Sequence, residues 1–119
     1  MPNAFMKLAV PAALAAAAAC RSDPIREIAA PAPAGALECS RRVLAGLGYA
    51  VDGGDAGGGY LYLQRPPDSL VAALVTVREG AGELRLSVST RTDRNRHAPP
   101  TDEALRHARS VISACASGS

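Results

Sequence analysis

The alternation of apolar and polar residues is most regular between residues 60 and 91. Residues 60–65 read YLYLQR, residues 70–78 read LVAALVTVR, and residues 83–91 read ELRLSVSTR. In the last of these segments Leu84, Leu86 and Val88 point to one face, and Arg85, Ser87 and Ser89 point to the other. Because successive side chains of a strand lie on opposite faces, this pattern predicts three strands with one apolar face. Residues 49–52 add a possible fourth short strand.

The pairing of the last two strands follows from keeping apolar side chains together. Pairing Glu79 with Leu84 sets Val77 opposite Leu86, whereas a shift by one residue would set Val77 against an arginine. This register predicts an antiparallel hairpin with a four-residue loop at residues 80–83.

Two segments show the periodicity of amphipathic helices. In residues 36–47 the apolar stripe contains Ala36, Cys39, Val43 and Leu47, and in residues 101–115 it contains Leu105, Ala108, Ile112 and Cys115. Thr101 is a favourable N-cap residue, followed by acidic residues in the first turn.

The order of these elements predicts an α+β fold, a two-layer sandwich of helix, three or four antiparallel strands and helix. Both helices are expected on one sheet face, within a single small domain at residues 36–119. The glycine-rich residues 53–59 are expected to form a plain loop. The element order resembles that of the helix-grip domains in lipoproteins of the outer-membrane barrel-assembly machinery.

An alanine-rich apolar run ends abruptly at Cys20. Lys7 is the only charge before Arg21, and the run between them is too short to span a bilayer, which takes about 20 residues. The residues AAAC at 17–20 resemble a bacterial lipobox, although Ala17 stands where leucine is usual. Residues 1–19 would then be a signal peptide, with Met6 as a possible true start. Ordinary cleavage after an Ala-x-Ala in the same run is the alternative.

The lipobox resemblance implies that Cys20 is lipidated and becomes the first residue of the mature chain. Such a lipoprotein carries three acyl chains, and two or more suffice for stable membrane anchoring. The resemblance therefore implies an exported protein, anchored in the cell envelope of a bacterium, and Arg21 after the cysteine favours the outer membrane. Residues 20–35, rich in proline and alanine, are expected to form an extended tether that reaches roughly 45 Å.

The cysteine count agrees with this interpretation. The chain has 3 cysteines, and lipidation of Cys20 leaves an even pair, Cys39 and Cys115. Both lie on the apolar stripes of the predicted helices, and an exported chain meets an oxidising compartment. The sequence predicts a disulfide between them, with two unpaired buried cysteines as the alternative.

Charge and composition narrow the range of partners. Lysine and arginine total 13 against 11 acidic residues, which gives a formal net charge of +2. So small a net charge does not indicate nucleic-acid binding. The expected partners are the membrane, through the lipid, and an envelope protein or a glycan.

Two places are candidates for binding. The sheet face away from the helices is expected to display Tyr60, Tyr62 and Arg85, and tyrosine and arginine are enriched at interface hot spots. The loop after residue 90 carries Arg91, Arg94, Arg96 and His97, which together suit contact with phosphate or carboxylate groups.

The sequence contains no recognisable catalytic, cofactor or metal-binding motif. The two histidines, His97 and His107, lie in no metal-ligand spacing, and His107 is expected to be exposed on its helix. A small hydrolase would need a pocket that joins His97 with a carboxylate. The sequence therefore favours a non-catalytic binding or scaffolding domain on a lipid anchor, and the alternative is a soluble secreted or periplasmic binding or inhibitor module.

Overall fold

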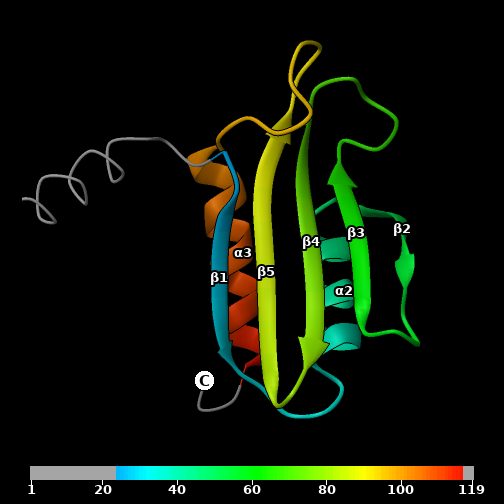
Figure 1. Ribbon diagram of the computed structural model, residues 1–119, viewed down its shortest axis with the longest axis vertical. Coiled ribbons are helices and arrows are strands. Elements are labelled where there is room, and N and C mark those ends of the chain that lie inside the picture. Colours follow the sequence, from blue (N-terminus) through cyan, green and yellow to red (C-terminus); the bar gives the residue numbers. More distant parts are fainter. Residues whose placement is uncertain (1–23, 117–119) are drawn as a thin grey trace, which may run out of the picture.

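The computed structural model describes residues 24–116, which form an α+β fold with a five-stranded antiparallel sheet and two helices. The strand order across the sheet is β1-β5-β4-β3-β2 (Figure 1). In sequence order the elements are β1 (Arg26–Pro31), α2 (Ala36–Gly46), β2 (Ala50–Asp55), β3 (Tyr60–Arg65), β4 (Ala72–Gly80), β5 (Glu83–Arg91) and α3 (Asp102–Cys115). Both helices lie behind the sheet in Figure 1, which leaves the other face open.

The register expected for the last hairpin is confirmed. Glu79 pairs with Leu84, Val77 with Leu86 and Val75 with Val88. The turn is tighter than expected, because Gly80 and Glu83 also pair and leave only Ala81 and Gly82 between the strands. Both turn residues have positive φ, 55° and 75°, as a two-residue hairpin turn matched to the sheet twist requires.

The expectation of three or four strands was wrong, because residues 26–31 form a fifth. This segment was assigned to the tether, but as β1 it pairs with β5 from Arg26↔Val88 to Pro31↔Glu83. Ile28 and Ala30 align with Leu86 and Leu84, so the strand extends the apolar face at one edge of the sheet. The folded unit therefore begins before residue 36, and residues 26–31 are not part of an extended tether.

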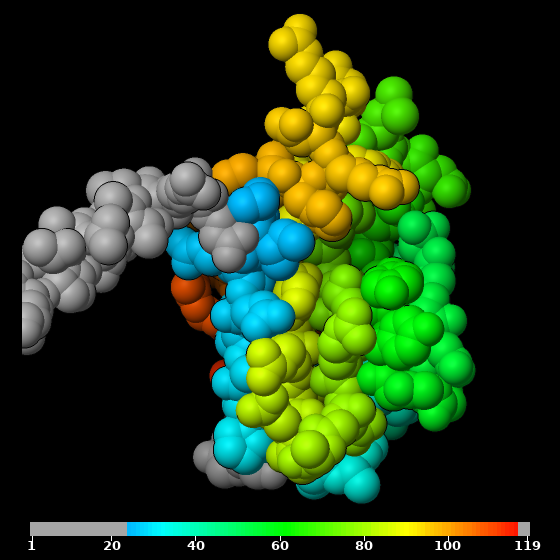
Figure 2. Space-filling view, in the orientation of Figure 1, coloured from blue at the N-terminus to red at the C-terminus, as the bar shows by residue number. Residues whose placement is uncertain are grey.

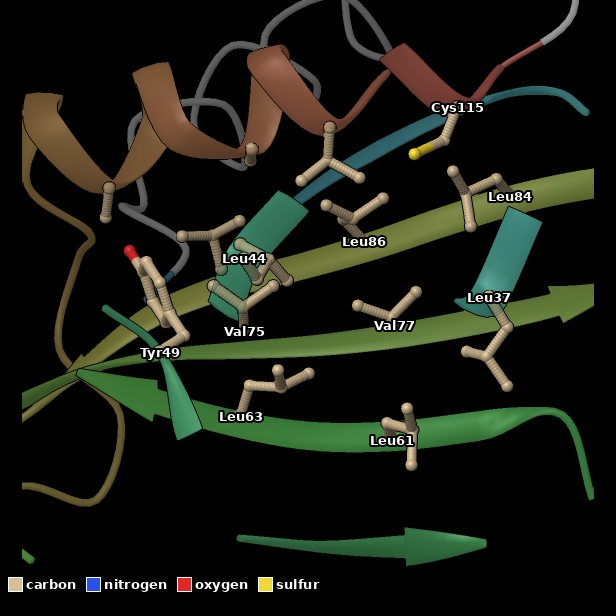
Figure 3. Close-up of a cluster of buried hydrophobic side chains, with 14 of the residues drawn as sticks. Leu37, Leu44, Tyr49, Leu61, Leu63, Val75, Val77, Leu84, Leu86 and Cys115 are labelled. Atoms are coloured by element: carbon tan, nitrogen blue, oxygen red, sulfur yellow. The ribbon is translucent and has the colours of Figure 1, made fainter. Parts of the chain in front are cut away.

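The core lies between the sheet and the two helices. Figure 3 shows labelled side chains of β3, β4 and β5, among them Leu63, Val75 and Leu86, pointing from the sheet toward the helices. On α2 the most buried residues are Ala36, Leu37, Ser40 and Leu44, so this helix is rotated relative to the expected stripe. Leu37 and Leu44 each follow a smaller residue of the expected stripe, Ala36 and Val43. Burying the two leucines removes more apolar surface from water. On α3 the buried residues include Leu105, Ala108 and Cys115, as expected, and Thr101 Oγ1 accepts a hydrogen bond from the Ala104 N–H at 3.1 Å.

The two helices are joined at one end of the molecule. The predicted disulfide between Cys39 and Cys115 is present, with a Cα–Cα distance of 5.7 Å. Nearby, the Glu79 carboxylate accepts hydrogen bonds from the N–H groups of Gly35, Ala36 and Leu37 at the start of α2. We call this the hairpin end; it comprises the connections at residues 32–35, 56–59 and 80–83 and the ends of the helices and strands beside them. The opposite end, formed by the connections at residues 66–71 and 92–100 and by the parts of the helices and strands beside them, is the loop end.

Within residues 24–116, neither helix has the length and apolar character needed to cross a membrane.

Candidate functional site

A hollow of about 510 Å³ lies on the open face of the sheet, next to the loop end. Its floor consists of side chains from the three central strands, and its upper wall comes from the loop after β5. In Figure 2 this loop, coloured yellow to orange, stands over the upper part of the face. Its lining includes Ile25, Asp52, Tyr62, Leu74, Thr76, Ser87, Ser89, Arg91, Arg96 and His97.

The wall is held against the sheet by short contacts after β5. Thr90 and Ala98 exchange two backbone hydrogen bonds, of 2.9 and 2.6 Å. Beside them, His97 Nδ1 lies 3.1 Å from Ser89 Oγ. The loop between them turns on Thr92, whose Oγ1 accepts the N–H groups of Arg94 and Asn95. These contacts fix the positions of Arg96 and His97 over the hollow.

Arg91 connects the hollow to the neighbouring loop. Its guanidinium donates to Gln64 Oε1 at 3.0 Å and to the carbonyl oxygens of Ser69 and Leu70. All three acceptors are neutral. The side chain therefore fixes the loop between β3 and β4, and its positive charge remains beside the hollow.

The arginines around the hollow do not form ion pairs. Within residues 24–116, no carboxylate lies within ion-pair distance of Arg91, Arg94 or Arg96. Asp52 supplies one carboxylate to the lining, from the irregular pairing of β2 between Val51 and Gly53. The hollow thus combines a hydroxyl-rich floor with an excess of positive charge.

The part of the open face near the hairpin end differs from the hollow. Arg85 pairs with Glu27 at 2.9 Å and with Glu83 at 2.7 Å. These hydrogen bonds, first that to Glu83, raise the pKa of the Arg85 guanidinium. Arg78 lies over the Tyr60 ring at 5.5 Å from its centroid. The cations at this end are therefore already occupied by groups of the same domain.

The structure brings together one residue of the predicted sheet face and three of the predicted basic loop. Tyr62, Arg91, Arg96 and His97 line one hollow, which joins the expected sheet face to the expected basic loop. Tyr60 and Arg85 lie toward the other end of the face, and Arg94 lies on the exposed loop without lining the hollow. Sequence reasoning missed Asp52 and Ile25, which depend on a strand irregularity and on the unexpected β1.

The Ser89–His97 contact has the spacing of a nucleophile and its base, and Asp52 lies in the same hollow. No hydrogen bond joins Asp52 to His97 among the described residues, and Ser89 is only 4% exposed. The hollow nevertheless joins His97 with a carboxylate, as a small hydrolase would need, and the Ser89–His97 contact also holds the loop against the sheet. The described part of the chain also contains no group of three metal-ligating side chains.

A second hollow, of about 540 Å³, lies on the helix side of the loop end. Arg65 and Glu103 form an ion pair at its edge, at 3.0 Å. Tyr49 is buried there, and its hydroxyl lies 3.0 Å from His107 Nδ1. The expectation of an exposed His107 was therefore wrong: burial, with Arg65 and Arg106 nearby, lowers its pKa, and Glu103 opposes the shift. Because these groups satisfy one another, this hollow is a weaker candidate for ligand binding.

No protein-family model, no curated protein and no solved structure matches this chain.

Proposed function

We propose that this protein is a membrane-anchored lipoprotein of the bacterial cell envelope whose domain binds a partner without catalysis. The partner is an envelope protein or a glycan, bound at the hollow on the open face. The observation that carries the proposal is the convergence of Tyr62, Arg96 and His97 on one hollow from two separate elements.

The anchor is supported by the sequence and by the disulfide. The apolar run ends at Cys20, which lies outside the described residues. Cys39 and Cys115 are bonded to each other, so the pairing leaves Cys20 as the odd cysteine. Lipidation gives that thiol a chemical role, since an exported chain seldom keeps a leftover thiol.

The lining of the hollow suits a polar ligand that carries a negative charge. Thr76 and Ser87 present hydroxyl groups, which both donate and accept hydrogen bonds. Tyr62 is 42% exposed and offers an aromatic surface, and Arg96 supplies a guanidinium with a geometry that matches a carboxylate or phosphate. An acidic side chain of a protein and an acidic sugar both meet these requirements.

Site-specific photo-crosslinking in cells tests the binding site. A photoreactive phenylalanine analogue replaces Tyr62, and the matched control places it at Arg42, exposed on α2 on the helix side. We expect a discrete adduct from position 62, absent from position 42 and reduced by Arg96→Ser. The same adduct from both positions, or none from position 62, would contradict the proposed site.

The intact mass of the protein extracted from membranes tests the anchor. We expect a chain that begins at Cys20, carries three acyl chains and gains two hydrogens on reduction. An unmodified chain in the soluble fraction, cut after an alanine, would instead favour a secreted or periplasmic binding or inhibitor module.

A further inference from the structure

The chain enters the domain at its loop end. β1 starts at Arg26, which pairs with Val88 near the end of β5, and Ile25 lines the same hollow as Arg96. In Figure 1 the blue start of β1 lies at the same end as the loops before β4 and after β5. Cys20 precedes Pro24 by four residues, so their Cα atoms are separated by no more than about 14 Å. An acylated Cys20 would therefore hold the loop end close to the membrane surface.

The same end carries the most exposed large apolar side chains. Leu70 is 76% exposed and Val71 is 53% exposed. They follow Pro66 and Pro67, which are also exposed, in the loop between β3 and β4. Arg91 holds the Ser69 and Leu70 carbonyl oxygens, so this loop is fixed while the two side chains face solvent. These two adjacent side chains are therefore available for apolar contact on a loop whose backbone is held in place.

The charges of the loop end are mixed. Arg94 and Arg96 lie on the loop after β5, together with Asp93. Asp68 lies on the loop between β3 and β4. Arginine reaches lipid headgroups while its stem remains on apolar surface. Since the two acids offset much of this charge, apolar contact and not attraction to anionic lipid is the main contribution.

We propose that the loop end, with Leu70 and Val71 foremost, rests in the interface of the membrane to which Cys20 anchors the chain. This inference rests on the proposed function, because it requires the anchor. The strands run from the loop end to the hairpin end, so the sheet stands upright on the membrane (Figure 1). In that orientation the open face and its hollow remain accessible from the side.

A single introduced tryptophan tests the contact, because the chain has no native one. Leu70→Trp places the reporter on the apolar loop, and Val71→Trp repeats the test at the next residue. Ala56→Trp is the matched control, exposed in the turn at the hairpin end. The full lipidated chain is reconstituted into phosphatidylcholine vesicles, with or without phosphatidylglycerol and with or without bromine in the acyl chains.

We expect bromolipid to quench the tryptophan at position 70 or 71 and to leave that at position 56 unchanged. The emission from position 70 should also shift to the blue, with little dependence on phosphatidylglycerol. If the acylated protein enters vesicles but positions 70 and 71 are quenched no more than position 56, the inference fails while the anchor stands. A mass that shows Cys20 unmodified would overturn the anchor and, with it, the inference.

Discussion

The two ends of this small domain are built differently. At the hairpin end, covalent and ionic contacts between elements satisfy the groups that lie there: the Cys39–Cys115 bond, the Glu79 carboxylate on the start of α2, and Arg85 between two glutamates. At the loop end, Arg91 and Arg96 have no carboxylate partner among the described residues, and Leu70 remains exposed. The hairpin end therefore carries the covalent link between the helices, and the loop end carries cations and apolar side chains that are available to a partner.

This division has a physical basis in the composition. The chain has no tryptophan and a single phenylalanine, which precedes the predicted cleavage point, so leucine, valine and alanine supply most of the core. A small domain with such a core usually needs a covalent link. With that link at the hairpin end, the opposite loops are able to keep charges and apolar side chains that contribute little to folding.

Removing the disulfide is the strongest test of the hairpin end. The bond joins residues 76 positions apart, and the loop-entropy relation gives up to about 4–5 kcal/mol for so long a loop. We expect Cys39→Ala with Cys115→Ala, in a Cys20→Ser background, to lower the free energy of unfolding by about 2–5 kcal/mol. Urea unfolding measures the loss, and the m-value should increase because the unfolded chain without the cross-link is less compact.

Ser110→Ala, at an exposed position of α3, is the matched control for that variant and should change stability by less than about 0.5 kcal/mol. A double cysteine variant as stable as this control would show that the hairpin end does not depend on its covalent link.

Replacing Arg91 tests how the loop end is held. Lysine keeps the positive charge but loses the fork that reaches Gln64, Ser69 and Leu70. We expect Arg91→Lys to lower the free energy of unfolding by about 1–2 kcal/mol and to speed amide hydrogen exchange in residues 68–71. Arg94→Lys, on the exposed loop, should do neither. Equal behaviour of the two variants would mean that Arg91 does not order the neighbouring loop.

The regular features of the fold could be predicted from the sequence, because local rules decide them. Strand alternation was sufficient to pair Val77 with Leu86, and Thr101 was recognisable as an N-cap. The disulfide followed from two cysteines on apolar helix faces. β1 was missed because residues 26–31 are rich in alanine and proline and have weak strand character; pairing with β5 makes them a strand.

The hollow was predicted only in parts. The sheet pattern placed Tyr62 and Ser87 on the open face, and the charge run singled out Arg96 and His97. Nothing local indicated that the loop folds back over the face. That arrangement depends on the Thr90–Ala98 backbone pair and on the Ser89–His97 contact, which join residues through the folded sheet.

The smallest effect expected is a pH dependence at the loop end, from His107 beside Tyr49. Burial lowers the pKa of His107, with help from Arg65 and Arg106 and against Glu103. As the pH falls through about 6.5, the unfolded chain therefore binds more protons than the folded chain. The stability that depends on a neutral His107 is present above that pH and is lost below it. Because the ring is partly exposed, we expect less than about 0.5 kcal/mol.

Chemical unfolding of the wild type and His107→Gln, measured between about pH 7.5 and about pH 5.5, isolates this contribution as the difference in slope. Glutamine keeps an acceptor for the Tyr49 hydroxyl, so the variant should lose the pH dependence with little loss of stability at neutral pH. Tyr49→Phe should lose the hydrogen bond and keep the sign of the slope, since the buried ring still desolvates His107. If His107→Gln and the wild type have equal slopes, the contact between His107 and Tyr49 makes no proton-linked contribution to stability.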